Sequence, residues 1–185
     1  MGEVIDDVIV FLAENGPSHQ APLAEYTGKD PKTISRVFRA MVKRSLVFDT
    51  GEILAYRTRA FPIYWLTRYG INHSLLKGAD PEKIRGYLRD FYSDIDLSLA
   101  LLACDVVEDP RGGGGALKMM NSITDNVLLG LKPDLKPVKL EEAEVIIDHM
   151  TKYIDIIDET VTHLVWCLEK LDKKHVKRLK KNLPF

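Results

Sequence analysis

Cysteine is scarce in this chain. Only Cys104 and Cys167 occur among 185 residues, and they lie far apart in apolar surroundings. Two distant cysteines cannot supply the disulfide framework of a small secreted domain, and they fit a reducing cytosol. We expect both to be small buried hydrophobic residues. The alternative is a redox sensor, which would need an exposed thiol that ionises easily.

A long hydrophobic run and a basic leader are also missing. The longest apolar run, residues 97–107, is interrupted by Ser98 and Asp105, and a membrane helix needs about 20 apolar residues. The first residues include Glu3, Asp6 and Asp7 in place of the basic start of a signal peptide. These absences predict a cytoplasmic protein without a membrane partner.

Catalytic and nucleotide-binding motifs are absent as well. The glycines at 112–115 lack the Gly-Lys-Ser/Thr ending of a phosphate-binding loop, so we interpret them as a flexible loop. Asp155, Glu159 and His163 step by four residues, a spacing that could suit a divalent ion. A solvated helix face is the simpler interpretation. We expect no enzyme activity, no cofactor and no metal.

Charge is nearly balanced overall, at −1, but it is unevenly distributed. Nine basic and three acidic residues lie between Lys29 and Arg68, which gives this segment a charge of +6 (9 − 3). A local basic surface on a neutral protein is typical of a site-specific nucleic-acid binder. A second basic group lies near the C-terminal end, where the helix dipole favours positive charge: Lys170, Lys173, Lys174, Lys177, Arg178, Lys180 and Lys181.

The same basic segment has the pattern of two helices joined by a tight turn. Residues 23–28 form a short helical segment that ends at Gly28, and Asp30 and Pro31 suit the cap and first position of a second helix over 32–46. One face of this second helix is apolar and the other is basic. This layout is that of a helix-turn-helix, whose second helix enters the major groove of DNA. The apolar face comprises Ile34, Val37, Phe38, Met41, Val42 and Leu46.

Four segments carry a resemblance to a known group of proteins. Residues 23–28, 33–36 and 43–47, with 64–70 after them, resemble the winged helix-turn-helix of MarR-, ArsR- and PadR-type regulators, over residues 1–77 only. The resemblance implies a DNA-binding module and no particular ligand. It departs at Ser45, where a glycine is usual, which predicts a less sharp turn. The wing, residues 48–62, is longer than usual.

Around this motif the sequence predicts a first helix over 4–12 and a β-hairpin. The hairpin has strands at 46–48 and 53–56 around the turn 49–52, and residues 63–66 could add a strand. The expected fold class is therefore mostly α with an α+β N-terminal part. A winged helix-turn-helix domain, residues 1–78, would precede a helical domain, residues 79–185.

The second domain is predicted to hold three helices: residues 82–107, 116–129, and a long C-terminal helix from Leu140 to about Lys181. Apolar residues in that last helix repeat by alternate steps of three and four, which is the heptad pattern of a coiled coil. At 1.5 Å per residue the helix would be about 60 Å long. We expect it to pack on its own domain and on a second copy of the chain, through Ile147, Met150, Ile154, Ile157, Val161, Leu164, Leu168 and Leu171.

The sequence thus predicts a sequence-specific double-stranded DNA-binding protein, and most simply a homodimeric transcriptional regulator. The alternative is a scaffold or assembly factor, or a replication or plasmid-maintenance factor, that acts through protein contacts. A small-molecule effector is possible, but no residue pattern indicates one. The expected DNA contacts, for base edges and phosphates together, are Lys32, Thr33, Ser35, Arg36, Arg39, Lys43, Arg57 and Arg59.

Overall fold

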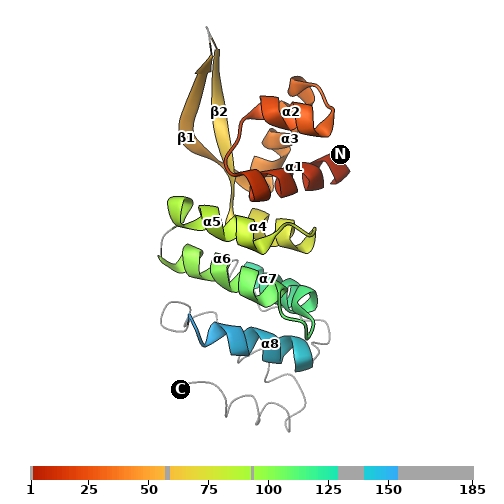
Figure 1. Ribbon diagram of the computed structural model, residues 1–185, viewed down its shortest axis with the longest axis vertical. Coiled ribbons are helices and arrows are strands. Elements are labelled where there is room, and N and C mark those ends of the chain that lie inside the picture. Colours follow the sequence, from red (N-terminus) through yellow and green to blue (C-terminus); the bar gives the residue numbers. More distant parts are fainter. Residues whose placement is uncertain (1, 57–58, 93, 129–139, 154–185) are drawn as a thin grey trace. The chain divides into compact units, whose positions relative to one another are not determined.

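Figure 1 shows the computed structural model, which describes residues 2–56, 59–92, 94–128 and 140–153. These residues form eight helices and one two-stranded antiparallel sheet, so the fold is mostly helical with a small α+β part. Contacts within the chain divide it into two compact units, Met1–Asp90 (unit 1) and Phe91–Phe185 (unit 2). The division falls later than residue 78, where the sequence placed the boundary.

Unit 1 begins with three helices: α1 (Gly2–Asn15), α2 (Gln20–Thr27) and α3 (Pro31–Lys43). The apolar face of α1 is buried, as its spacing predicts, and α3 buries its own apolar face in the same core. Each large side chain removed from water contributes about 1.5–3 kcal/mol before entropy is counted. The largest buried side chains of this core include Ile9, Leu12, Leu23, Ile34, Phe38, Met41 and Trp65.

The turn between α2 and α3 follows the local signals in the sequence. Gly28 ends α2 with φ +64°, a left-handed conformation that glycine adopts without strain. Asp30 precedes α3, and its carboxylate accepts a hydrogen bond from the Thr33 backbone N–H at 2.9 Å. Pro31 is the first residue of α3, where no N–H is needed. The predicted cap, turn and second helix are confirmed.

The end of α3 differs from the prediction in three respects. The helix ends at Lys43 and not at residue 46. Val42 was expected on the apolar face, but its side chain is 46% exposed. Ser45 was expected to make a less sharp turn than glycine, yet it adopts φ +54°, the left-handed conformation that glycine would favour. The chain therefore turns sharply here and brings the Leu46 N–H to the Met41 carbonyl at 2.9 Å.

The β-hairpin is larger than predicted, and its turn lies elsewhere. Strand β1 (Val47–Tyr56) runs through the residues that were expected to form the turn, and it pairs with β2 (Arg59–Leu66). Residues 49–52 form an irregularity within β1, where Gly51 has φ +80° and its N–H donates to the Asp49 carboxylate at 2.9 Å. The Thr50 hydroxyl donates across to the Ile63 carbonyl at 3.1 Å. A bulge therefore produced the glycine-containing signal that sequence analysis assigned to a turn.

Two further helices complete unit 1: α4 (Arg68–Leu76) and α5 (Pro81–Phe91). The Thr67 hydroxyl caps α4 by accepting from the Gly70 N–H at 3.2 Å. Tyr87 of α5 packs edge-on against the buried Trp65, with ring centroids 5.6 Å apart. The first half of the predicted helix 82–107 therefore belongs to unit 1.

That predicted helix is in fact two helices, because α5 ends at Phe91 and α6 (Asp94–Val107) begins after it. Asp94 fits this break, since aspartate is poor in helix interiors and is favoured at helix starts. Within α6, the side chains from Leu99 to Val106 are mostly buried, as the nearly uniform apolar sequence predicts.

Unit 2 also contains α7 (Gly113–Leu128) and α8 (Leu140–Met150). Of the four glycines that were interpreted as a flexible loop, the last three form the first turn of α7, so the interpretation is wrong for 113–115; Gly112 lies in the turn before the helix. A Cβ at Gly113 would lie 2.2 Å from the Val106 carbonyl oxygen, and one at Gly115 would lie 2.3 Å from the Glu142 carboxylate. Glycine is needed at position 113 because the backbone of α6 approaches it closely, whereas the flexible Glu142 side chain can move away from position 115.

The predicted long C-terminal helix ends early within the described residues. Helix α8 stops at Met150, and the N–H groups of Lys152 and Tyr153 donate to carbonyls three residues back, as in a turn. Ile147 and Met150, each 2% exposed, belong to the core of their own chain. The other expected dimerisation residues lie outside the described residues: Ile154, Ile157, Val161, Leu164, Leu168 and Leu171.

Candidate nucleic-acid interface

A row of cationic side chains lies along the solvent face of α3. Lys32, Arg36, Arg39 and Lys43 recur by steps of four, three and four residues, so they share one face of the helix, and all are exposed. The opposite face is in the core of unit 1. We call these four residues the α3 cationic row. Arg44, directly after α3, is exposed too.

The α3 cationic row makes no ion pair with any residue that the structure describes, although the chain carries 27 acidic and 26 basic residues. Several cations elsewhere do have such partners. Lys77 lies 2.6 Å from Asp6, and Lys83 lies 3.1 Å from Glu14. Exposed cations without acidic partners create a positive potential that attracts a polyanion.

The two hydroxyl residues of the predicted interface have local roles. The Thr33 hydroxyl donates to the Asp30 carboxylate at 2.7 Å as part of the helix cap. These hydrogen bonds from Thr33 hold the pKa of Asp30 below its ordinary value. The Ser35 hydroxyl has two acceptors for its one proton, the amide oxygen of Gln20 and the Pro31 carbonyl at 3.0 Å. Both side chains are half-buried, so they fix α2 and α3 as well as facing solvent.

A pocket of about 300 Å³ lies beside the cationic row, between α3 and β2. Its wall includes Phe38 and Tyr64, whose rings stack with centroids 4.3 Å apart. Burial raises the pKa of the Tyr64 hydroxyl above its ordinary value; the Asp49 carboxylate adds to this rise, and the Arg39 guanidinium opposes it. Arg39 lines the pocket and belongs to the row. The sequence patterns did not indicate this pocket, because β2 and α3 meet only in the folded chain. Its other lining residues include Gln20, Ser35, Phe61 and Pro62.

Of the two arginines predicted for the wing, only Arg59 lies within the described residues. Arg57 lies outside the described residues. Arg59 begins β2, and its backbone pairs with Tyr56 across the hairpin. Two apolar side chains of the same hairpin, Ile53 and Leu54, are 64% and 42% exposed.

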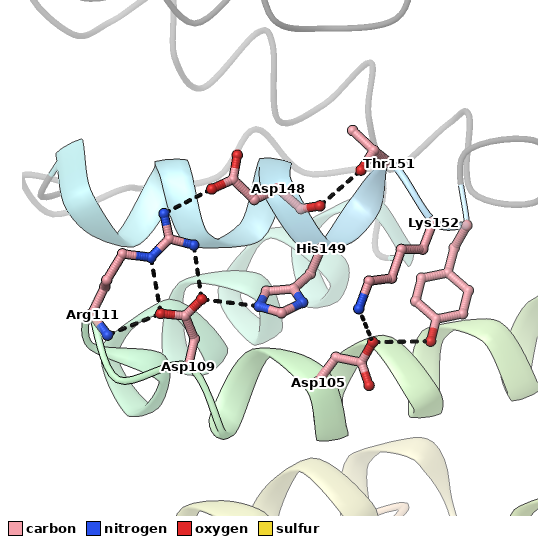
Figure 2. Close-up of polar contacts among 8 residues, drawn as sticks. Asp105, Asp109, Arg111, Asp148, His149, Thr151 and Lys152 are labelled. Carbon is pink, nitrogen blue, oxygen red and sulfur yellow. Dashed lines mark hydrogen bonds and ion pairs between the residues drawn. The ribbon is translucent and has the colours of Figure 1, made fainter.

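A second polar cluster lies in unit 2, and Figure 2 shows it. The carboxylate of Asp109, only 7% exposed, accepts from Arg111 Nη2 at 2.8 Å and from His149 Nε2 at 3.0 Å. Arg111 Nη1 donates to Asp148 at 2.7 Å. These contacts join the loop between α6 and α7 to α8. A second link joins Lys152 Nζ to the Asp105 carboxylate at 3.0 Å.

The charges of this cluster support one another. Hydrogen bonds from Arg111 hold the pKa of Asp109 far below its ordinary value, although burial opposes this and His149 adds to it. Hydrogen bonds to Asp109, and then to Asp148, raise the pKa of Arg111. The cluster is a structural clasp, because each charge is matched by a partner 37 to 40 residues away or by a neighbour. The sequence patterns did not indicate this cluster, because its partners lie far apart in the chain.

Metal, thiol and membrane sites were the other possibilities that the sequence raised. In the part of the chain that the structure describes, no group of three or more histidine, cysteine or carboxylate side chains could hold a metal ion. The expected ligands Asp155, Glu159 and His163 lie outside that part, as does Cys167. Cys104 is buried, as predicted. Among the described helices, none is both long enough and apolar enough to cross a bilayer.

Comparison with known proteins adds no assignment. No protein-family model, no curated protein and no solved structure matches this chain.

Proposed function

We propose that the chain is a sequence-specific double-stranded DNA-binding protein, and that it acts as a homodimeric transcriptional regulator. In this proposal α2, α3 and the β1–β2 hairpin form a winged helix-turn-helix, with α3 as the helix that enters the major groove. The α3 cationic row carries the proposal: four exposed cations on one helix face, without acidic partners among the described residues, beside a capped turn. This is the electrostatic footprint of a DNA-reading helix.

We assign different roles to the residues of the row and to the other expected DNA contacts. Arg36 lies in the second turn of α3, where recognition helices contact base edges, and an arginine can pair with guanine through two hydrogen bonds. Arg39 and Lys43 are further along the helix and contact phosphates. Lys32, Thr33 and Ser35 lie at its start, where Thr33 and Ser35 position the helix through their hydrogen bonds. The wing arginines, Arg57 and Arg59, contact the backbone or the minor groove.

The test begins with selection of bound duplexes from a random pool, followed by affinity measurements on the selected sequence. We expect Arg36→Ala to lose about 1–3 kcal/mol of discrimination at one base position. Lys43→Ala should weaken binding to all duplexes alike and lower the slope of log affinity against log salt by about 1. Lys118→Ala, an exposed cation of unit 2, is the control and should change neither. Unaltered preference in the Arg36 variant would overturn the assignment.

One observation favours a second candidate, a scaffold that binds proteins through unit 1. Ile53 and Leu54 are large apolar side chains exposed on the hairpin, and exposed apolar residues recur at protein contacts. A scaffold would bind duplex DNA weakly and without sequence preference. The same selection experiment separates the two, because a scaffold enriches no sequence.

A further inference from the structure

The pocket between α3 and β2 has the chemistry of a site for one nucleobase. Phe61 and Tyr64 are half-buried aromatic side chains on its wall, and Phe38 lies behind Tyr64 in the stacked pair. Aromatic side chains of this kind stack on unpaired bases with little dependence on sequence. A volume of about 300 Å³ is at the small end of ligand sites and too small for a large cofactor.

Polar groups stand at the edge of this aromatic wall. The amide oxygen of Gln20 is engaged by the Ser35 hydroxyl, and the amide nitrogen has two donors, with no acceptor among the described residues. Such donors suit the carbonyl and ring-nitrogen acceptors of a base edge. Arg39 uses its Nε to donate to the Ser35 carbonyl at 3.3 Å, and its terminal nitrogens are not in an ion pair within the described residues. The guanidinium can therefore hold the phosphate attached to the base.

The position of the pocket connects it to the proposed DNA interface. Arg39 is a member of the α3 cationic row and a lining residue of the pocket. A duplex held along α3 would thus pass the pocket at a phosphate-binding arginine. An unpaired nucleotide beside that phosphate could enter the pocket without displacing the rest of the duplex.

We propose that this pocket binds a single nucleobase together with its phosphate, supplied by an unpaired nucleotide of the bound DNA. This inference deepens the proposed function and rests on it. A free mononucleotide carries the same chemistry, and the experiment below distinguishes the two sources. The protein would then prefer DNA that contains a bulged or extruded base, because ejecting such a base from the stack costs little.

The experiment compares the full chain on two duplexes that differ by one bulged nucleotide. We expect the bulged duplex to bind roughly tenfold more tightly, the effect of one stacked base. Phe61→Leu keeps an apolar side chain without a stacking ring, and Gln20→Ala removes the amide donors. Both should reduce the ratio of bulged to perfect affinity, and Phe61→Leu should leave affinity for the perfect duplex unchanged. Ile53→Ala, on the same hairpin but outside the pocket, is the matched control and should keep the preference.

Calorimetric titration with adenosine and thymidine monophosphates tests the second source. Saturable binding that is lost in Phe61→Leu would show that the pocket holds a nucleobase with its phosphate. If the protein then shows no preference for the bulged duplex, the site binds free nucleotides and not an unpaired nucleotide of DNA. Equal affinity for both duplexes together with no mononucleotide binding overturns the inference but leaves the proposed function standing. Failure to bind either duplex overturns the proposed function instead. In that case the mononucleotide titration alone tests whether the pocket binds a nucleobase.

Discussion

Ser45 has a strained backbone conformation. It is the one non-glycine residue of the described chain with a positive φ, at +54°. A side chain in this conformation costs about 1–2 kcal/mol, because Cβ crowds the following carbonyl. The turn is retained because it starts β1 and returns the chain to α3 through the Leu46–Met41 hydrogen bond.

Replacing Ser45 with glycine should therefore stabilise the protein. We expect Ser45→Gly to raise the free energy of unfolding by about 1 kcal/mol, after the greater freedom of glycine in the unfolded chain is subtracted. Urea denaturation measures this change. Ser45→Ala keeps the Cβ and should give no such gain. An equal gain in both variants would mean that the serine hydroxyl, and not the backbone conformation, is the cause.

Two adjacent glycines of α7 differ in the space available for a side chain. A Cβ at Gly113 would meet the backbone oxygens of Val106 and Val107 at 2.2 and 2.6 Å, whereas one at Gly114 meets nothing within 4 Å. Gly113→Ala should destabilise the protein by about 1–3 kcal/mol through overpacking. Gly114→Ala should stabilise it by up to about 1 kcal/mol through helix propensity. Thermal denaturation of the pair checks this, and equal melting temperatures would contradict the close approach of α6 and α7.

At the scale of elements, local signals predicted more than long-range ones. The α2–α3 turn was predictable because Gly28, Asp30 and Pro31 act on their immediate neighbours. The glycine in 49–52 was misassigned because a bulge and a hairpin turn both use a positive φ, and only the partner strand decides between them. The pocket beside α3 and the clasp at Asp109 depend on contacts between distant residues, which periodicity does not report.

Because of the clasp between the α6–α7 loop and α8, we expect the free energy of unfolding to depend on pH. The pKa of Asp109 is lowered on folding, so its contribution is complete above the unfolded pKa, about 4, and is lost as pH falls through the lower folded value. We expect the free energy of unfolding to decline as pH falls below about 4. Asp109→Asn should lower stability at neutral pH and flatten this decline.

The control for the clasp is Asp148→Asn, which removes a more exposed partner of the same arginine. It should leave most of the acid-dependent decline in place. Denaturation curves recorded from pH 7 down to pH 2 provide the comparison. Should the Asp109 variant retain the full decline, other carboxylates would be responsible for it.

At the scale of the whole molecule, the proposed function depends on two chains acting together. Ile147 and Met150 stabilise their own chain, so a dimer would depend on the heptad residues that follow them. A two-fold symmetric pair of α3 helices would read half-sites about 34 Å apart, one turn of DNA.

We expect sedimentation equilibrium to give twice the chain mass, 2 × 21.0 kDa. The double variant Leu164→Asp/Leu168→Asp should sediment as a single chain and retain its affinity for a half-site while losing its advantage on the full site. Leu54→Asp, on the exposed hairpin, is the control and should stay dimeric. A wild-type chain that sediments as a monomer at micromolar concentration would exclude the homodimer.

One backbone group has a wider consequence. The Leu46 carbonyl accepts from the Thr67 N–H at 2.9 Å, and Gly70 packs so tightly against it that a Cβ there would lie 2.0 Å from the oxygen. The end of α3, the base of the hairpin and the start of α4 therefore share a single anchor point. A side chain added at Gly70 would therefore push on all three elements at once, and it would disturb the seating of α3 without touching that helix.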